Sequence, residues 1–178
     1  MLLTRWLSLV NFSYKYCVSG RFISNQVDMK TQINTTHMLN KAIEIAEKAF
    51  KDKKDKGGCP YRDHLNRVAW SLLDEGYNVM TIAWLHDLIE DCEEWNEARL
   101  LEYFDKEIVD CVMLLTHKKK DSYEAYIDKI LKDWDAVKVK MAELKDNMNI
   151  IRLPVIEEKD LKRLVKHHAA YKRLEASL

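Results

Sequence analysis

The sequence from residue 84 to residue 91 is Trp84-Leu85-His86-Asp87-Leu88-Ile89-Glu90-Asp91, and it places four ionisable side chains in a mostly apolar stretch. Burying such a group without a partner is costly, and neighbouring carboxylates repel each other unless a cation neutralises them. On a helix that turns about 100° per residue, the four side chains share an arc of about 140°. The pattern predicts one helix face that holds a metal ion with acid or base groups beside it.

The composition favours a single globular domain. The chain has 178 residues, of which 47% are apolar, and this is enough for one substantial core. Its 29 basic residues balance 29 acidic ones, so no overall field attracts nucleic acid or an anionic membrane. The four cysteines are widely spaced and form no CxxC pair, so we expect no disulfides and a cytoplasmic location.

Residues 1–29 differ from the rest of the chain, because aromatic side chains there alternate irregularly with basic ones. The apolar patch from Trp6 to Val10 is too short to cross a membrane, and no signal-peptide cleavage site follows it. We expect a poorly ordered extension, or an upstream start codon with Met29 as the natural beginning. The alternative is a basic aromatic segment that touches a membrane or a partner.

The remainder, residues 30–178, is expected to form one all-α domain, a helical bundle. The chain has only four glycines and two prolines, and its β-branched residues form no sustained alternating run. From Thr35 onward, apolar residues recur with helical spacing. We expect helices over residues 38–51, 61–75, 78–91, 97–104, 106–117, 122–134, 135–151 and 157–175.

Two further polar groups accompany the first stretch. His64 stands early in a predicted helix whose later residues form an apolar stripe. Glu143, Asp146 and Asn147 share one face of another predicted helix through i,i+3 and i,i+4 spacing. Each group alone is ordinary, since histidines beside a core are usually hydrogen-bonded and surface carboxylates are usually solvated. Their order along the chain is the informative feature.

This ordered series resembles the HD-domain metal-dependent phosphohydrolases, and among them the hydrolase domain of RelA/SpoT proteins and the small stand-alone enzymes of that type. The resemblance runs from about Leu39 to Leu174. It rests on the YxxH at Tyr61 and His64, the HDxxED from His86 to Asp91, and the closing stretch Val139-Lys140-Met141-Ala142-Glu143-Leu144-Lys145-Asp146-Asn147-Met148.

The resemblance implies His64, His86 and Asp87 as metal ligands, with a later carboxylate as the fourth. Glu143 stands where the family usually has aspartate, and Asp146 stands one turn later where the family often has histidine. Glu143 is the first choice for the fourth ligand, and Asp146 is the alternative. Imidazole and carboxylate donors suit manganese, iron, cobalt or zinc, and Mn²⁺ is what the family implies.

The family pattern also implies roles in catalysis for Glu90 and Asp91, which would orient a water molecule or carry its proton. A bound divalent cation lowers the pKa of water and polarises a phosphoryl oxygen.

Four residues match substrate-binding positions of the resembled family. Lys53 and Lys54 stand where a basic pair contacts the nucleotide, although Lys53 replaces a common arginine and lacks its bidentate fork. Asn147 matches the asparagine that contacts the sugar or phosphate, and Tyr123 is expected to line the pocket. The alternative for residues 51–56 is a solvated basic loop.

The resemblance implies hydrolysis of the 3′-pyrophosphate of guanosine tetra- or pentaphosphate, which yields GDP or GTP and pyrophosphate. One alternative is an HD phosphatase that acts on another nucleotide or nucleotide cofactor. Another is an HD domain that senses a nucleotide without cleaving it, which the glutamate at position 143 leaves open. The expected partner is a nucleotide, with no nucleic acid and no membrane, and the sequence is compatible with a homo-oligomer.

Overall fold

The computed structural model describes residues 15–18, 21–24 and 29–178, and the chain divides into two compact units, residues 1–34 and 35–178. The first unit contains a hairpin that the sequence did not predict. Its strands β1 (Lys15–Val18) and β2 (Arg21–Ser24) pair antiparallel, with Lys15 opposite Ser24. The apolar patch from Trp6 to Val10 lies outside the described residues.

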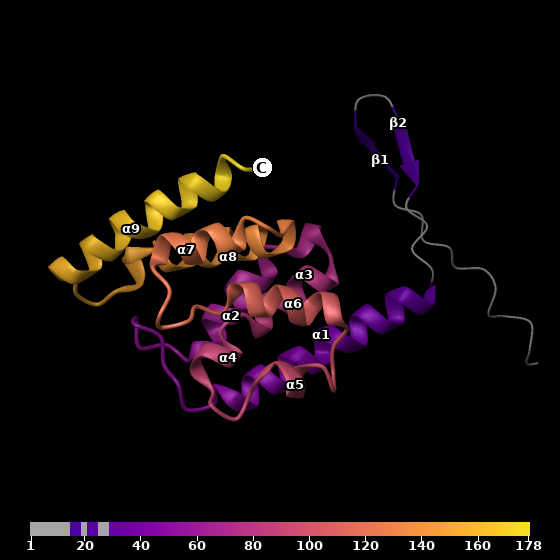
Figure 1. Cartoon of the computed structure of the whole chain (residues 1–178), viewed down its shortest axis with the longest axis horizontal. Coiled ribbons are helices and arrows are strands. Elements are labelled where there is room, and N and C mark those ends of the chain that lie inside the picture. The colour runs from indigo at the N-terminus through magenta and orange to yellow at the C-terminus, as the bar shows by residue number, and fades with distance from the viewer. Residues whose placement is uncertain (1–14, 19–20, 25–28) are drawn as a thin grey trace, which may run out of the picture. The chain divides into compact units, whose positions relative to one another are not determined.

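From Met29 to Leu178 the described elements are helical apart from one isolated bridge, so the all-α prediction is confirmed there (Figure 1). No helix among the described residues is long and apolar enough to cross a membrane. The helices are α1 (Met29–Ala49), α2 (Tyr61–Trp70), η1 (Leu73–Glu75), α3 (Tyr77–Leu85), α4 (Leu88–Asp91), α5 (Glu97–Leu100), α6 (Lys106–Leu115), α7 (Tyr123–Ile130), α8 (Trp134–Asn147), η2 (Ile150–Arg152) and α9 (Glu158–Glu175).

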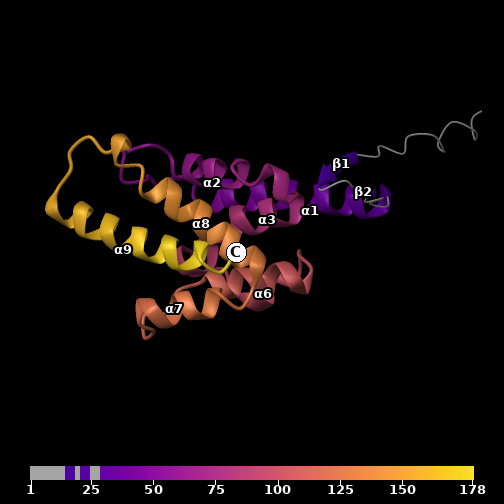
Figure 2. The same cartoon turned by 90° about the horizontal axis from the view of Figure 1, so that it is seen from above.

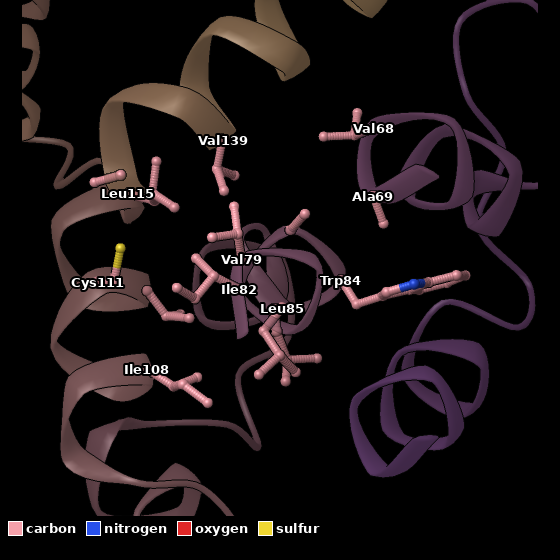
Figure 3. Packing of buried hydrophobic residues seen from close by; sticks show 14 of the residues in the cluster. Val68, Ala69, Val79, Ile82, Trp84, Leu85, Ile108, Cys111, Leu115 and Val139 are labelled. Atoms are coloured by element: carbon pink, nitrogen blue, oxygen red, sulfur yellow. The ribbon is translucent and has the colours of Figure 1, made fainter. Parts of the chain in front are cut away.

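Helix α3 is the centre of the second unit. All of its residues from Val79 to Leu85 are buried, as expected for a helix that is apolar around its whole circumference. It packs against α2, α6 and α8. Figure 3 shows its side chains between Cys111 of α6 and Ala69 of α2, with Val139 of α8 above them. The polar residues that follow α3 are therefore carried directly into the interior.

The predicted continuous helix over residues 78–91 is wrong at His86 and Asp87, which form a turn between α3 and α4. The Ala83 carbonyl, which accepts the amide of residue 87 in a regular helix, accepts a hydrogen bond of 2.6 Å from Nδ1 of the His86 imidazole. Helical hydrogen bonding is present again in α4, where the Asp91 amide donates to the Asp87 carbonyl at 3.0 Å. The His86 side chain thus bonds to a carbonyl that a regular helix pairs with a backbone amide.

Helices α8 and α9 pack against each other after a turn that includes η2, as Figure 2 also shows from above. Helix α1 begins at Met29 rather than near residue 38, with mostly exposed polar residues in its first turns. Helix α8 ends at Asn147, four residues before the predicted end at 151. The α2–α8 and α3–α8 contacts bring Glu143 and Asp146 toward the turn formed by His86 and Asp87.

Candidate metal centre

Three of the predicted ligands converge in the interior. His64 comes from the first turn of α2, and His86 and Asp87 form the turn between α3 and α4. One ligand atom from each lies within 4.8 Å of the other two, and both histidines are buried. Pro60, immediately before α2, has the extended backbone that precedes a helix start. Helix α2 therefore begins at Tyr61, and His64 lies in its first turn.

The outer nitrogen of each imidazole is already engaged. Nδ1 of His86 donates to the Ala83 carbonyl, and Nδ1 of His64 lies 2.6 Å from Oδ2 of Asp146. Each ring therefore turns its other nitrogen, Nε2, toward Asp87. Nε2 of His86 and Nε2 of His64 lie 3.1 Å and 3.9 Å from Oδ2 of Asp87.

Nε2 of His86 is buried and has no hydrogen-bond partner among the described residues. Lone pairs that face a carboxylate at such distances require a proton or a cation between them. Because two imidazoles with a carboxylate are a common donor set for divalent metals, these residues fit a metal ion.

Charge in this group is strongly coupled. Burial by itself lowers the pKa of His86, but the Asp87 carboxylate outweighs that effect and raises the pKa to about 9. Burial likewise opposes ionisation of Asp87, yet His86 and a hydrogen bond from the Tyr61 hydroxyl hold its pKa well below the ordinary value. The Asp87 carboxylate therefore favours a positive charge beside it, either a proton on His86 or a cation.

The two candidates for the fourth ligand lie on α8, and neither belongs to the three-residue group. Oε2 of Glu143 accepts a hydrogen bond of 2.6 Å from Nζ of Lys140, and Oε1 accepts one of 3.0 Å from the Asn147 amide. Both Glu143 and Lys140 are buried. Asp146 instead contacts the outer nitrogen of His64 and two arginines.

Helix α4 carries the predicted acid and base groups. Oε2 of Glu90 accepts a hydrogen bond of 3.0 Å from the His117 amide, and burial raises the pKa of Glu90 above its ordinary value. Asp91 forms an ion pair with Lys53. Glu90 and Asp91 are both exposed, so solvent can reach the two carboxylates.

A pocket of about 250 Å³ lies beside His64 and gathers three of the predicted substrate-binding residues, Lys53, Lys54 and Asn147. Burial lowers the pKa of Lys56, and the nearby Arg163 guanidinium lowers it further. The full lining is Lys53, Lys54, Asp55, Lys56, Gly57, Tyr61, His64, Asn147, Asn149, Arg152, Leu153 and Arg163.

Tyr123 does not line this pocket. It borders a separate groove between α7 and α9, where Nζ of Lys166 lies 4.3 Å from the centre of its ring. Its hydroxyl is buried and has no hydrogen-bond partner among the described residues.

Sequence reasoning missed three charged residues beside the site, Asp55, Arg67 and Arg152. Each of the two arginines pairs with Asp55 and with Asp146. They come from a loop, α2 and η2, and no spacing in the sequence relates them. It also missed His167 of α9, whose Nδ1 atom is buried without a hydrogen-bond partner in the described part of the chain.

The comparison with solved structures identifies the fold. The structure of a metazoan ortholog of SpoT, which hydrolyzes ppGpp and plays a role in starvation responses, superposes with a TM-score of 0.68. The match covers 79% of this chain and 86% of that chain at 19% sequence identity. No protein-family model matches the sequence, and no curated protein matches it. The chain therefore shares the fold of that protein, in line with the fold that the order of its motifs predicted.

Proposed function

We propose that this protein is a metal-dependent phosphohydrolase that removes the 3′-pyrophosphate of guanosine tetra- or pentaphosphate. The observation that carries the proposal is the pair of buried imidazoles that face Asp87, beside a pocket lined by several lysine and arginine side chains. The shared fold with a protein described as hydrolysing ppGpp supports the choice of substrate.

His64, His86 and Asp87 would hold the divalent cation, for which we propose Mn²⁺, and Glu143 would supply the fourth ligand. When bound, the cation supplies an acidified water and polarises a phosphoryl oxygen. The Tyr61 hydroxyl holds Asp87 through its hydrogen bond to Oδ2. The Ala83 carbonyl holds His86 in the tautomer that a metal requires.

Glu90 is the proposed base for the attacking water. The His117 amide fixes one of its oxygens, and its pKa is raised above the ordinary value, the direction that a general base near neutral pH needs. Asp91 would assist by orienting the water and by holding Lys53 through their ion pair. Water attacks the 3′-linked phosphorus, the bond to the ribose oxygen breaks, and that oxygen takes up a proton.

The substrate binds by its charge and its sugar. Lys53 and Lys54 line the pocket next to His64 and would neutralise phosphate oxygens. Asn147 lies on the same wall and holds Glu143 through its amide, so its carbonyl oxygen is available for a ribose hydroxyl. The cytoplasmic location and the homo-oligomer remain predictions.

A second candidate function is nucleotide sensing without turnover. It is favoured by one observation, the engagement of both Glu143 oxygens by Lys140 and Asn147. A carboxylate held in this way contributes to metal binding only if the metal shares or displaces these partners.

The test is to measure metal content and turnover of the purified protein with Mn²⁺ against a panel of nucleotides. Asp87→Asn should lose both, because it removes the charged ligand and keeps its volume. Asp63→Asn, which alters an exposed carboxylate of α2, is the matched control and should change neither. Full metal occupancy and turnover in Asp87→Asn would contradict the assignment.

The double variant Glu90→Gln with Asp91→Asn separates binding from chemistry. It should retain metal but lose turnover by about 10²-fold or more, the scale of general acid and base catalysis. Loss of metal in this variant would show that the pair supplies ligands. Nucleotide binding without any product in the metal-loaded wild-type protein would favour the sensor.

A further inference from the structure

Asp146 stands at the centre of a charged cluster on the outer side of His64. Its Oδ2 lies 2.6 Å from Nδ1 of His64 and 3.0 Å from an Arg152 nitrogen. Its Oδ1 accepts a hydrogen bond of 2.7 Å from Nε of Arg67. The Asp146 side chain is 9% exposed, so these bonds lie in a partly dehydrated setting.

The cluster extends to the loop between α1 and α2, whose residues 53–57 line the pocket. Arg152 donates to Oδ2 of Asp55 at 2.7 Å and to the Asp146 carbonyl at 2.8 Å. The loop also passes so close to η2 that a Cβ atom added to Gly57 would lie 2.8 Å from the Arg152 carbonyl oxygen. Two arginines and two carboxylates thus connect α2, α8, η2 and the loop.

We propose that Asp146 is a positioning residue, which holds the His64 ring with a proton on Nδ1 and leaves Nε2 for the cation. This role rests on His64 acting as a ligand, as proposed above. It also assigns Asp146 to the outer side of the imidazole rather than to the metal. Carboxylates that accept a bond from a ligating histidine orient the ring and increase its basicity.

The two arginines determine what a substitution does. Arg67 and Arg152 carry only donors, so they require acceptor oxygens. In Asp146→Asn the single remaining oxygen would be drawn to the guanidinium groups, and the amide NH₂ would turn toward His64. An NH₂ group there needs a lone pair on Nδ1, which moves the ring proton to Nε2, the atom that faces Asp87. That tautomer cannot bind a cation through Nε2.

The experiment measures the His64 tautomer and Mn²⁺ affinity separately. The tautomer is read from ¹⁵N shifts and two-bond ¹⁵N–¹H correlations of the metal-free protein, at a pH where the imidazole is neutral. Wild type should carry the proton on Nδ1, and Asp146→Asn should carry it on Nε2. Calorimetry should show Mn²⁺ affinity reduced about 10- to 100-fold in Asp146→Asn.

Asp55→Asn is the matched control, because Asp55 pairs with the same two arginines and does not contact His64. It should keep the wild-type tautomer and nearly the wild-type Mn²⁺ affinity, and Asp146→Glu, which restores a carboxylate, should recover part of the lost affinity. An equal loss of affinity in Asp55→Asn would overturn the proposal, because it would make the effect one of cluster stability.

The wild-type spectrum tests the proposal even if Asp146→Asn does not fold. A proton on Nε2 of wild-type His64 would overturn it directly. An unchanged tautomer and affinity in folded Asp146→Asn would do the same. If wild type binds no Mn²⁺ but shows the Nδ1 tautomer and its loss in Asp146→Asn, the positioning role stands and the proposed function fails.

Discussion

The buried pair of Lys140 and Glu143 offers a quantitative test of the fourth ligand, through the substitution Lys140→Met. Nζ of Lys140 lies 2.6 Å from Oε2 of Glu143, and the two side chains are 9% and 10% exposed. Burial lowers the pKa of Lys140, but Glu143 outweighs this effect and raises it, which favours the charged ammonium. Methionine keeps most of the unbranched side chain and leaves the Glu143 carboxylate without its cation.

Breaking a buried ion pair by removing one partner costs about 3 to 5 kcal/mol. In a chain of 178 residues each kcal/mol shifts Tm by about 2 to 4 °C, so metal-free Lys140→Met should melt about 6 to 20 °C below wild type. Lys138→Met is the matched control on the same helix. Lys138 pairs with Glu75 at a more exposed position, and its loss should cost less than about 1 kcal/mol.

The assay is thermal and urea unfolding of a double-mutant cycle, without metal and with Mn²⁺. Without metal, Lys140→Met with Glu143→Gln should be much less destabilised than the sum of the single variants, because neither charge is left unpaired. With Mn²⁺ at about 100 times its dissociation constant, binding adds about 2.7 kcal/mol to wild type. At that same Mn²⁺ concentration, Lys140→Met should gain more, because Glu143 then has no competing cation.

Additive destabilisation in the cycle would refute the buried pair as a coupled unit. An equal gain from Mn²⁺ in Lys140→Met, Glu143→Gln and wild type would refute Glu143 as the fourth ligand. The same titrations should show that Glu143→Gln weakens Mn²⁺ binding more than Asp146→Asn does. Glu143→Gln removes a ligand, whereas Asp146→Asn only disturbs the orientation of the His64 ring.

Two further predictions concern stability. Burial lowers the pKa of His167 to about 4, so the unfolded state takes up its proton first as the pH falls from about 6.5. Stability should therefore decline between about pH 6.5 and pH 4, and urea unfolding of His167→Gln should show a shallower decline, while His168→Gln, which alters an exposed histidine, should not. Deleting residues 1–28 should leave Tm and turnover nearly unchanged, because all motifs lie in the compact unit 35–178; a large fall in Tm would show that the removed segment contributes to the fold.

Much of the fold could be predicted because its signals are local. Helical spacing of apolar residues and caps such as Asn96 and Ser122, whose side chains accept amide hydrogen bonds, define α5 and α7. The break at His86 could not be predicted, since it depends on an imidazole that bonds to the Ala83 carbonyl. The β1–β2 hairpin was missed because its strands have only four residues each.

The candidate site likewise combines residues that the sequence could predict with residues whose surroundings it could not. The structure brings His64, His86 and Asp87 together, and these residues have a motif order that sequence alone reveals. The environments of Glu143 and Asp146 depend on tertiary contacts. Lys140 lies one turn before Glu143, so their pairing follows from helix geometry, whereas the arginines around Asp146 come from distant segments. Tyr123 borders the groove between α7 and α9, and its role in substrate binding stays a prediction.

The most direct test of the proposed function is the product released from guanosine tetraphosphate by the Mn²⁺-loaded wild-type protein, followed by ³¹P NMR. Cleavage beside the ribose oxygen leaves the diphosphate unbroken, so the predicted products are GDP and intact pyrophosphate in equal amounts. Asp87→Asn should release neither. Release of single phosphates, or no product from protein that contains its metal, would contradict the proposed function.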